Sequence, residues 1–141
     1  MKKNIIAGII IFSFSTLVFA EERIPPVTDQ VTINECGACH MVYPAKLLGA
    51  KSWEKLISGL DNHFGEDASL EKSAETHIKN YLMINAGRHS ETPLRITNLR
   101  WFKREHTNRG NWKKYLIRKN INSSSNCIAC HKAAEKGVFD D

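Results

Sequence analysis

The sequence predicts an all-α protein with little or no sheet, organised as two lobes. Apolar residues recur at helical spacing in three stretches, and no stretch shows the sustained alternation of a half-buried strand. One short motif, two cysteines three positions apart followed directly by a histidine, occurs at Cys36–His40 and again at Cys127–His131. These two copies use every cysteine of the chain and are its only internal repeat. We therefore expect a small helical protein with one motif in each lobe.

The first 20 residues have the pattern of a secretory signal peptide. Lys2 and Lys3 are followed by a mostly apolar run, and Ala20 offers a small residue before a cleavage point. The alternative is a retained membrane anchor, but the run is short for a span of about 20 apolar residues. We predict a cleaved signal peptide over residues 1–20 and a periplasmic location.

Charge and size narrow the classes of function. Without the predicted signal peptide, 121 residues remain, with 18 basic against 15 acidic side chains. The basic residues are interleaved with acidic ones along the chain, so nothing indicates a nucleic-acid partner. A chain of this size forms a modest core.

The first lobe is expected over residues 21–92. Residues 21–32 contain two consecutive prolines and read as an irregular lead-in. Asn34 and Glu35 are expected to cap a short helix that carries the first motif, and Pro44 disfavours helix at the residue before it.

Two longer helices follow in the first lobe. Ser52 is a good N-cap for a helix over residues 53–63, whose apolar residues fall on one face, and Gly65 is a natural stop. The next helix is expected from Asp67 or Ser69 to Ala86. Its predicted inner face consists of Leu70, Ala74, Ile78, Tyr81 and Leu82.

The second lobe is expected over residues 93–141. A third amphipathic helix is predicted from Asn98 to His106, and residues 112–122 are ambiguous. Ser123–Asn126 is rich in capping residues and predicts a final helix that carries the second motif and ends before Gly137.

The repeated motif is the pattern of covalent haem attachment. Two cysteines at this spacing add across the vinyl groups of a haem, and the adjoining histidine lies beneath the iron as an axial ligand. The sequence thus predicts two covalently bound haem c groups, with attachment at Cys36, Cys39, Cys127 and Cys130 and with His40 and His131 as proximal iron ligands. A zinc site would need cysteines 91 residues apart and leaves both histidines unexplained. A redox dithiol usually lies in an α/β pattern, which is absent.

The distal ligands have several candidates. Outside the motifs these are His63, His77, His89, His106 and Met83. Four histidines for two positions favour bis-histidine ligation at both irons, which gives a lower reduction potential than methionine does. His63 and His106 each close an apolar helical face, but His77 also falls on an inner face, so spacing alone does not decide. Distance along the chain pairs His63 with His40 and His106 with His131.

The basic side chains near the third helix and four aromatic side chains have two interpretations each. The basic ones either pair with haem propionates or form a solvated face: Arg95, Arg100, Lys103 and Arg104. The aromatic ones either line haem pockets or pack in an ordinary core: Trp53, Phe64, Trp101 and Phe102.

Five stretches give the chain a resemblance to a known family. They are Glu35–Pro44, Asp61–Ser69, Pro93–Thr97, Trp101–His106 and Cys127–Asp141. Together they resemble the bacterial periplasmic dihaem cytochrome c family often called DHC. The resemblance implies two haem lobes, bis-histidine irons and electron transfer, with His63 and His106 as the distal ligands. It also implies redox partners such as a monohaem oxygen-binding c-type cytochrome and a membrane cytochrome b.

We therefore expect a periplasmic one-electron carrier and not an enzyme, because no bond-making site is evident. One alternative is a small electron-transfer subunit of a larger periplasmic oxidoreductase such as nitrate reductase, although the 91-residue spacing of the motifs counts against it. Another is a haem sensor or catalyst with one open iron position.

Overall fold

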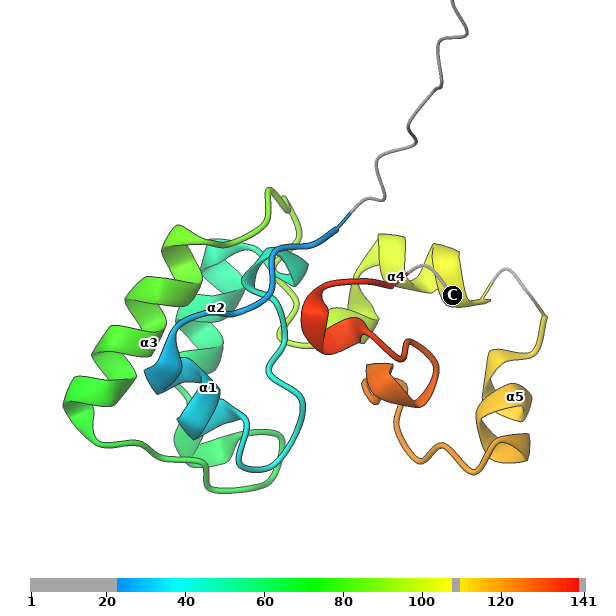
Figure 1. The fold of residues 1–141 in the computed structure, drawn as a ribbon, viewed down its shortest axis with the longest axis horizontal. Helices are drawn as coiled ribbons and strands as arrows, with labels where there is room; N and C mark the ends of the chain where they lie inside the picture. The colour runs from blue at the N-terminus through cyan, green and yellow to red at the C-terminus, as the bar shows by residue number, and fades with distance from the viewer. Residues whose placement is uncertain (1–22, 108–109, 140–141) are drawn as a thin grey trace, which may run out of the picture.

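The computed structural model describes residues 23–107 and 110–139. These residues form five α-helices joined by turns and short 3-10 segments, and they contain no β-strand, so the all-α prediction is confirmed (Figure 1). The helices are α1 (Gln30–Cys36), α2 (Ala50–Ile57), α3 (Lys72–Ile84), α4 (Arg100–Thr107) and α5 (Trp112–Arg118). No helix within the described ranges is both long enough and apolar enough to span a bilayer. The predicted signal peptide, residues 1–20, lies outside them.

The core forms where α2 packs against α3. Trp53 and Ile57 of α2 meet Ile78 and Leu82 of α3, and all four are at most 5% exposed. Burying each such side chain stabilises the fold by about 1.5–3 kcal/mol. The indole nitrogen of Trp53 keeps a partner inside this core, because it donates to the Ala45 carbonyl at 2.7 Å.

The core continues past residue 92. Leu99 and Phe102, at 1% and 6% exposed, belong to the same buried cluster as the side chains of α2 and α3. Figure 1 nevertheless shows α1–α3 gathered on one side and α5 with the C-terminal turns on the other. The division at residues 92 and 93 stays a prediction, with α4 joining the two sides.

The start of α1 differs from the sequence prediction. The helix begins at Gln30, because Asp29 accepts a hydrogen bond from the Thr32 amide at 2.8 Å and acts as the N-cap. It ends at Cys36, where Gly37 closes the last turn by donating to Ile33. The predicted cap at Asn34 and Glu35 was therefore wrong, and most of the first motif lies in the turn after the helix.

The second predicted helix is shorter than expected. Gly49 precedes its first turn, whereas Ser52, predicted as the cap, is buried inside α2. The helix ends at Ile57 with Ser58 as its C-cap, because Gly59 leaves helical geometry at φ −127°, and a 3-10 turn over Leu60–Asn62 follows. His63 therefore lies on a turn and not on the helix face from which it was predicted.

The structure bears out the predicted helices at α3 and α4 with shifted bounds, but not the predicted final helix. Glu71, not Asp67 or Ser69, caps α3, and its buried face contains Ile78 and Leu82 as predicted. The ambiguous stretch contains α5. The predicted final helix was wrong: the chain forms two 3-10 turns, Cys127–Ala129 and Ala134–Lys136, and Ala133 between them lies outside the helical region at φ −111° and ψ 20°.

A backbone hydrogen bond joins the lead-in to the C-terminal turn. The Ile24 amide donates to the Gly137 carbonyl at 2.9 Å. Gly137 has φ 76°, and a side chain there would collide with the Ile24 carbonyl. A glycine is therefore required where the lead-in crosses the C-terminal turn.

Candidate functional site

The first candidate site brings together His40 and His63. Their ring centroids are 6.2 Å apart, and the ring planes differ by 23°. His40 follows α1 in the loop of the first motif, and His63 follows the turn over Leu60–Asn62. His40 and His63, which were paired by their distance along the chain, therefore also lie close together in the structure. Both histidines lie on segments between helices.

A tight turn holds His63. The His63 amide donates to the Glu66 carbonyl at 2.7 Å, and the Gly65 amide donates to Asn62 Oδ1 at 3.2 Å. Phe64 and Gly65 both have positive φ, at 60° and 108°. A non-glycine residue at such an angle costs about 1–3 kcal/mol, and such strain clusters at functional sites. The Phe64 ring lies 4.8 Å from His63 and carries the Arg95 guanidinium 3.8 Å above it.

The protonation of this pair suits metal binding. His40 Nδ1 lies 2.7 Å from the Met41 carbonyl. Because a carbonyl only accepts, Nδ1 carries the proton, which leaves Nε2 as the metal-binding nitrogen. Burial lowers the pKa of His63, and the nearby His40 and Arg95 lower it further. The neutral imidazole that a metal requires is therefore favoured at His63.

The second candidate site brings together His106 and His131. Their ring centroids are 6.1 Å apart, and the planes stand at 85°. His106 lies in the last turn of α4, where its Nδ1 donates to the Phe102 carbonyl at 2.8 Å and its ring stacks on Phe102 at 3.9 Å. Here the helix itself fixes the histidine.

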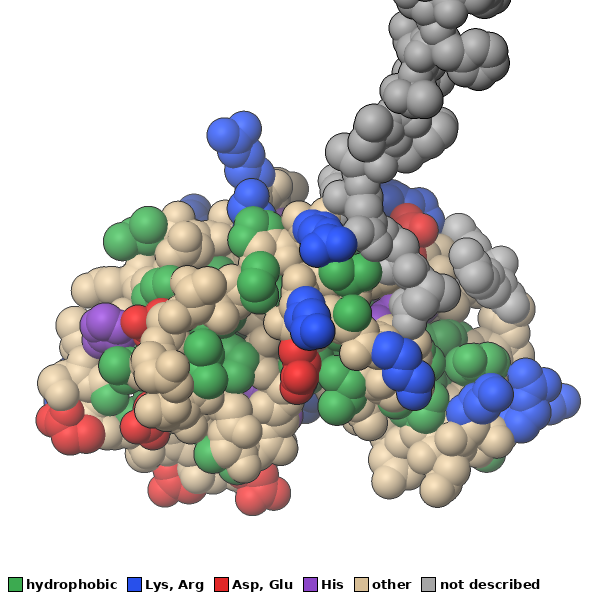
Figure 2. Space-filling model, viewed as in Figure 1, with side chains coloured by type: hydrophobic (Ala, Val, Ile, Leu, Met, Phe, Trp, Pro, Cys, Tyr) green, Lys and Arg blue, Asp and Glu red, His purple; other side chains and the backbone are tan. Residues whose placement is uncertain are grey.

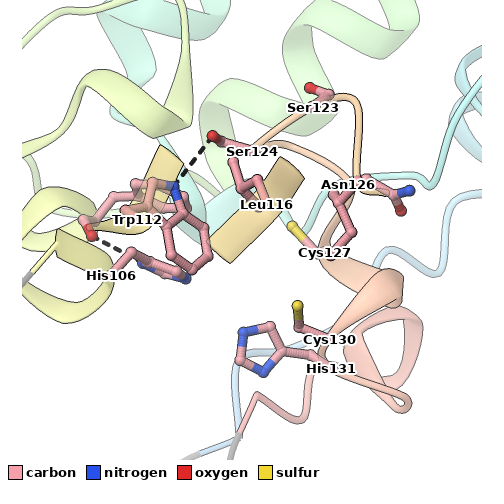
Figure 3. A pocket seen from close by; sticks show the side chains of 11 residues that line it. His106, Trp112, Leu116, Ser123, Ser124, Asn126, Cys127, Cys130 and His131 are labelled. Carbon is pink, nitrogen blue, oxygen red and sulfur yellow. Dashed lines mark hydrogen bonds between the residues drawn. The ribbon is translucent and has the colours of Figure 1, made fainter. Parts of the chain in front are cut away.

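A pocket separates these two histidines. Figure 3 shows His106 and Trp112 on one side, facing Cys127, Cys130 and His131 on the other. Trp112 closes one edge because its indole nitrogen donates to Ser124 Oγ at 3.2 Å. The pocket is lined by Phe102, His106, Trp112, Leu116, Ile121, Ser123, Ser124, Asn126, Cys127, Cys130 and His131. Of the aromatic residues predicted to line pockets, Phe102 does so here, whereas Trp53 packs in the core.

Both histidine pairs have the spacing that one metal ion between them requires. An imidazole nitrogen binds a metal at about 2.0 Å, and the ring centroid lies about 1.1 Å behind it, so opposed imidazoles hold their centroids about 6 Å apart. The described residues contain no cluster of three or more ligating side chains that would hold a metal unaided. The four cysteines thus do not form the zinc site considered from sequence. The residues present fit an iron that arrives within a porphyrin.

The first cysteine of each motif lacks the lowered thiol pKa of a reactive dithiol. Burial, with a smaller effect of Glu35, raises the pKa of the Cys36 thiol to about 11. Burial likewise raises the pKa of Cys127. Redox-active CXXC motifs depend on a lowered thiol pKa. A covalent attachment role agrees better with these surroundings.

The two spare histidines are engaged elsewhere. His77, predicted on an inner face, has a side chain that is 51% exposed, and its Nε2 lies 2.8 Å from the Asp29 carboxylate. His89 Nε2 lies 3.0 Å from the Lys46 carbonyl. Both Nε2 atoms therefore carry protons, because their partners only accept. Among the described residues, His63 and His106 are the spare histidines that face a motif histidine.

Two of the basic residues near α4 lie in solvent beside acidic side chains. The side chains of Arg100 and Arg104 are 88% and 66% exposed and lie near Glu91 and Glu105, which is a solvated arrangement.

The indole nitrogen of Trp101 is buried and has no acceptor among the described residues. A carboxylate such as a haem propionate is the kind of acceptor that this nitrogen requires.

Comparison with known proteins places the chain among dihaem cytochromes. The family model of the dihaem cytochromes c, DHC, matches residues 32–139. A search of curated proteins gives no match.

Solved structures of similar sequence also match. DHC purified from Rhodobacter sphaeroides is 51% identical with a TM-score of 0.73, and the match covers 81% of this chain and 99% of that one. The dihaem cytochrome c of Shewanella baltica OS155 is 38% identical with a TM-score of 0.70, over 79% of this chain and 86% of that one.

Proposed function

The chain belongs to the dihaem cytochrome c family, DHC, and we propose that it is a periplasmic one-electron carrier with two bis-histidine haems. Two covalently bound haem c groups come with the family, and the two cysteine motifs provide their attachment. When bound, each haem supplies an iron that changes between the ferric and ferrous states.

Each haem would be held by one motif and one histidine from elsewhere. Cys36, Cys39 and His40 would hold the first, completed by His63. The second site has the same composition, with Cys127, Cys130 and His131 completed by His106. The observation that supports both assignments is the separation of about 6 Å within each histidine pair.

Two imidazoles per iron have chemical consequences. A closed coordination sphere leaves no position for oxygen or a substrate, which supports a carrier and not an enzyme. Replacing methionine by histidine as an axial ligand lowers the reduction potential, so low-potential centres are expected. The carbonyl partners of His40 and His106 would fix the ring orientation and make the imidazoles better donors.

The redox partners we propose are a monohaem c-type cytochrome and a membrane cytochrome b. Docking would use the basic C-terminal region. On α5 the Ile117 side chain is 79% exposed among Lys113, Lys114 and Arg118. Figure 2 shows Lys and Arg side chains gathered at that end of the molecule. Association with an acidic partner would then slow as salt is raised, because screening weakens electrostatic steering.

Removing the distal histidines tests the ligand assignment. Because each substitution opens one iron, His63→Ala and His106→Ala should each convert one site from low-spin to high-spin. The reduced form of each variant should then bind carbon monoxide rapidly at one haem. Low-temperature electron paramagnetic resonance of the oxidised protein reports the change of spin state, and absorption spectra of the reduced protein report carbon monoxide binding.

The matched controls are His77→Ala and His89→Ala. Both should keep two low-spin irons and bind no carbon monoxide, since their rings are engaged with Asp29 and Lys46. Unaltered low-spin spectra in His63→Ala or His106→Ala would show that the distal assignment of that residue is wrong.

A further inference from the structure

Tyr43 lies where the two attachment motifs come together. Its ring packs against His40, with centroids 5.1 Å apart and planes tilted by 33°. Its hydroxyl donates to the Ser125 carbonyl at 2.8 Å, across 82 residues of sequence. Ser125 stands two residues before Cys127. One side chain therefore touches both the first proximal histidine and the entry to the second motif.

The Ser125 carbonyl carries this contact on to Cys127. The Cys127 amide donates to the same oxygen at 2.9 Å, and the Cys127 thiol lies 3.5 Å from it. Thioether formation consumes the S–H, whereas the Tyr43 hydroxyl and the Cys127 amide remain and match the two lone pairs of a carbonyl. A continuous chain of contacts then runs from the His40 ring to the backbone of Cys127.

The segment that receives the Tyr43 hydroxyl has a fixed shape of its own. The Asn126 amide donates to the Ser123 carbonyl at 3.1 Å, and the Ser125 amide donates to Ser123 Oγ at 3.2 Å. Trp112 holds the neighbouring Ser124 from the pocket. A bond from Tyr43 to this segment therefore orients the whole entry to the motif.

The Tyr43 side chain is half-buried, and its hydroxyl faces a carbonyl, which can only accept. The hydroxyl is therefore the donor in this contact.

We propose that Tyr43 is a positioning residue that fixes the second attachment motif against the first proximal histidine and so sets the rate of electron exchange between the two haem sites. The part that concerns electron exchange rests on the proposed function. Electronic coupling decays faster across gaps than along bonds and hydrogen bonds. Loss of the hydroxyl would interrupt the chain of contacts while leaving the ring against His40.

The test compares Tyr43→Phe with wild type as haem-loaded full chains. Hydrogen–deuterium exchange should be about fivefold faster at the protected amides of residues 126–131, the factor that losing a hydrogen bond of about 1 kcal/mol gives. In half-reduced samples, exchange between the paramagnetically shifted haem signals in nuclear magnetic resonance should be several-fold slower. Because the ring remains against His40, the low-spin signal of that site should be unchanged.

Tyr81→Phe is the matched control. The Tyr81 hydroxyl accepts a hydrogen bond from the Thr28 amide at 3.1 Å, across 53 residues, but neither partner belongs to a motif. This variant loses the same group and a long-range bond, yet amide exchange near Cys127 and electron exchange should match wild type.

Wild-type rates in Tyr43→Phe, or equal changes in both variants, would overturn the proposal. Wild-type protein provides a test that needs no variant: nuclear Overhauser contacts are expected between the Tyr43 ring and Ser125 or Asn126, and their absence would also overturn it. Both the amide and the Overhauser readouts are independent of the distal ligands. If the irons prove not to be bis-histidine, the proposed function fails while the role of Tyr43 in positioning is still tested.

Discussion

The two histidine pairs have nearly the same separation but differ in almost everything else. The centroid distances are 6.2 Å for His40 and His63 and 6.1 Å for His106 and His131. The ring planes differ by 23° in the first pair and by 85° in the second. A turn with two positive-φ residues holds His63, whereas a helix holds His106. The distance between the two rings is thus nearly equal in the two pairs, whereas the angle between the ring planes is not.

The two regions also differ in charge. Residues 21–92 contain 7 basic and 11 acidic residues, a net charge of −4, and residues 93–141 contain 11 basic and 4 acidic residues, a net charge of +7. Basic and acidic residues alternate over short stretches of the chain, so this difference in net charge between the two regions is not evident from local sequence. Figure 2 shows the acidic side chains mainly over the α1–α3 side. The two haems would therefore sit in different electrostatic fields, which would separate their potentials.

The largest expected effect comes from Phe102→Ala, which should disturb the second pair alone. Phe102 is both a core residue and the ring on which His106 stacks. The substitution should cost about 3–5 kcal/mol of unfolding free energy, measured by urea titration. It should also loosen His106, so a high-spin fraction should appear at the second site.

Ile78→Ala is the matched core control. Ile78 is fully buried, and its loss should cost about 2–5 kcal/mol, but it lies on α3, which contributes no member to either histidine pair. Its spectra should match wild type. An equal spectral change in both variants would mean that general loosening of the core, and not the stacking of His106, controls the site.

Two glycine substitutions, one near each histidine pair, should have smaller effects on stability and should each affect a different site. Gly65 and Gly110 have φ of 108° and 101°, and a side chain at either would meet no atom of the described residues within 4 Å. Alanine at either position should therefore cost about 1–3 kcal/mol through backbone strain alone. Gly65→Ala should perturb the spectrum of the first site, and Gly110→Ala should perturb only the second. Urea titration and absorption spectra of the two variants separate these outcomes, and a reversed assignment would contradict the predicted grouping.

The smallest expected effect concerns the cap of α1. Hydrogen bonds from Thr32, then from His77, lower the pKa of Asp29 from its ordinary 3.8 to about 2. Because the folded-state value is the lower one, this stabilisation is present above pH 3.8 and is lost as the pH falls toward 2. Asp29→Asn keeps a capping side chain and should lose less stability than wild type between pH 4 and 2 in urea titrations. Parallel losses in the two proteins would exclude Asp29 as the titrating group.

Local sequence patterns predicted the haem chemistry of this protein well and the bounds of its helices less well. The cysteine motifs identified the haem attachment, because covalent chemistry needs those residues at that spacing. Periodicity also found the buried face of α3 around Ile78 and Leu82. The cap at Asp29 was missed because its partner Thr32 lies within the stretch read as irregular.

Hydrophobic periodicity could not predict contacts between residues that are far apart in the sequence. His77 was placed on an inner face, but its bond to Asp29 draws it to the surface of α3. The turn that presents His63 depends on positive φ at Phe64, a conformation that aromatic residues rarely adopt and that no sequence pattern announces. The link from Tyr43 to Ser125 spans 82 residues and has no local signal.

Low-temperature electron paramagnetic resonance of the oxidised wild-type protein reports the angle between the two imidazole planes at each iron. Nearly parallel imidazole planes give a rhombic low-spin signal, whereas perpendicular planes give a highly anisotropic one. Two low-spin signals of equal amount are therefore expected, a rhombic one that is lost in His63→Ala and an anisotropic one that is lost in His106→Ala. A high-spin signal from the wild-type protein at neutral pH, or two signals of the same type, would contradict the assignment of two opposed histidine pairs with different ring angles.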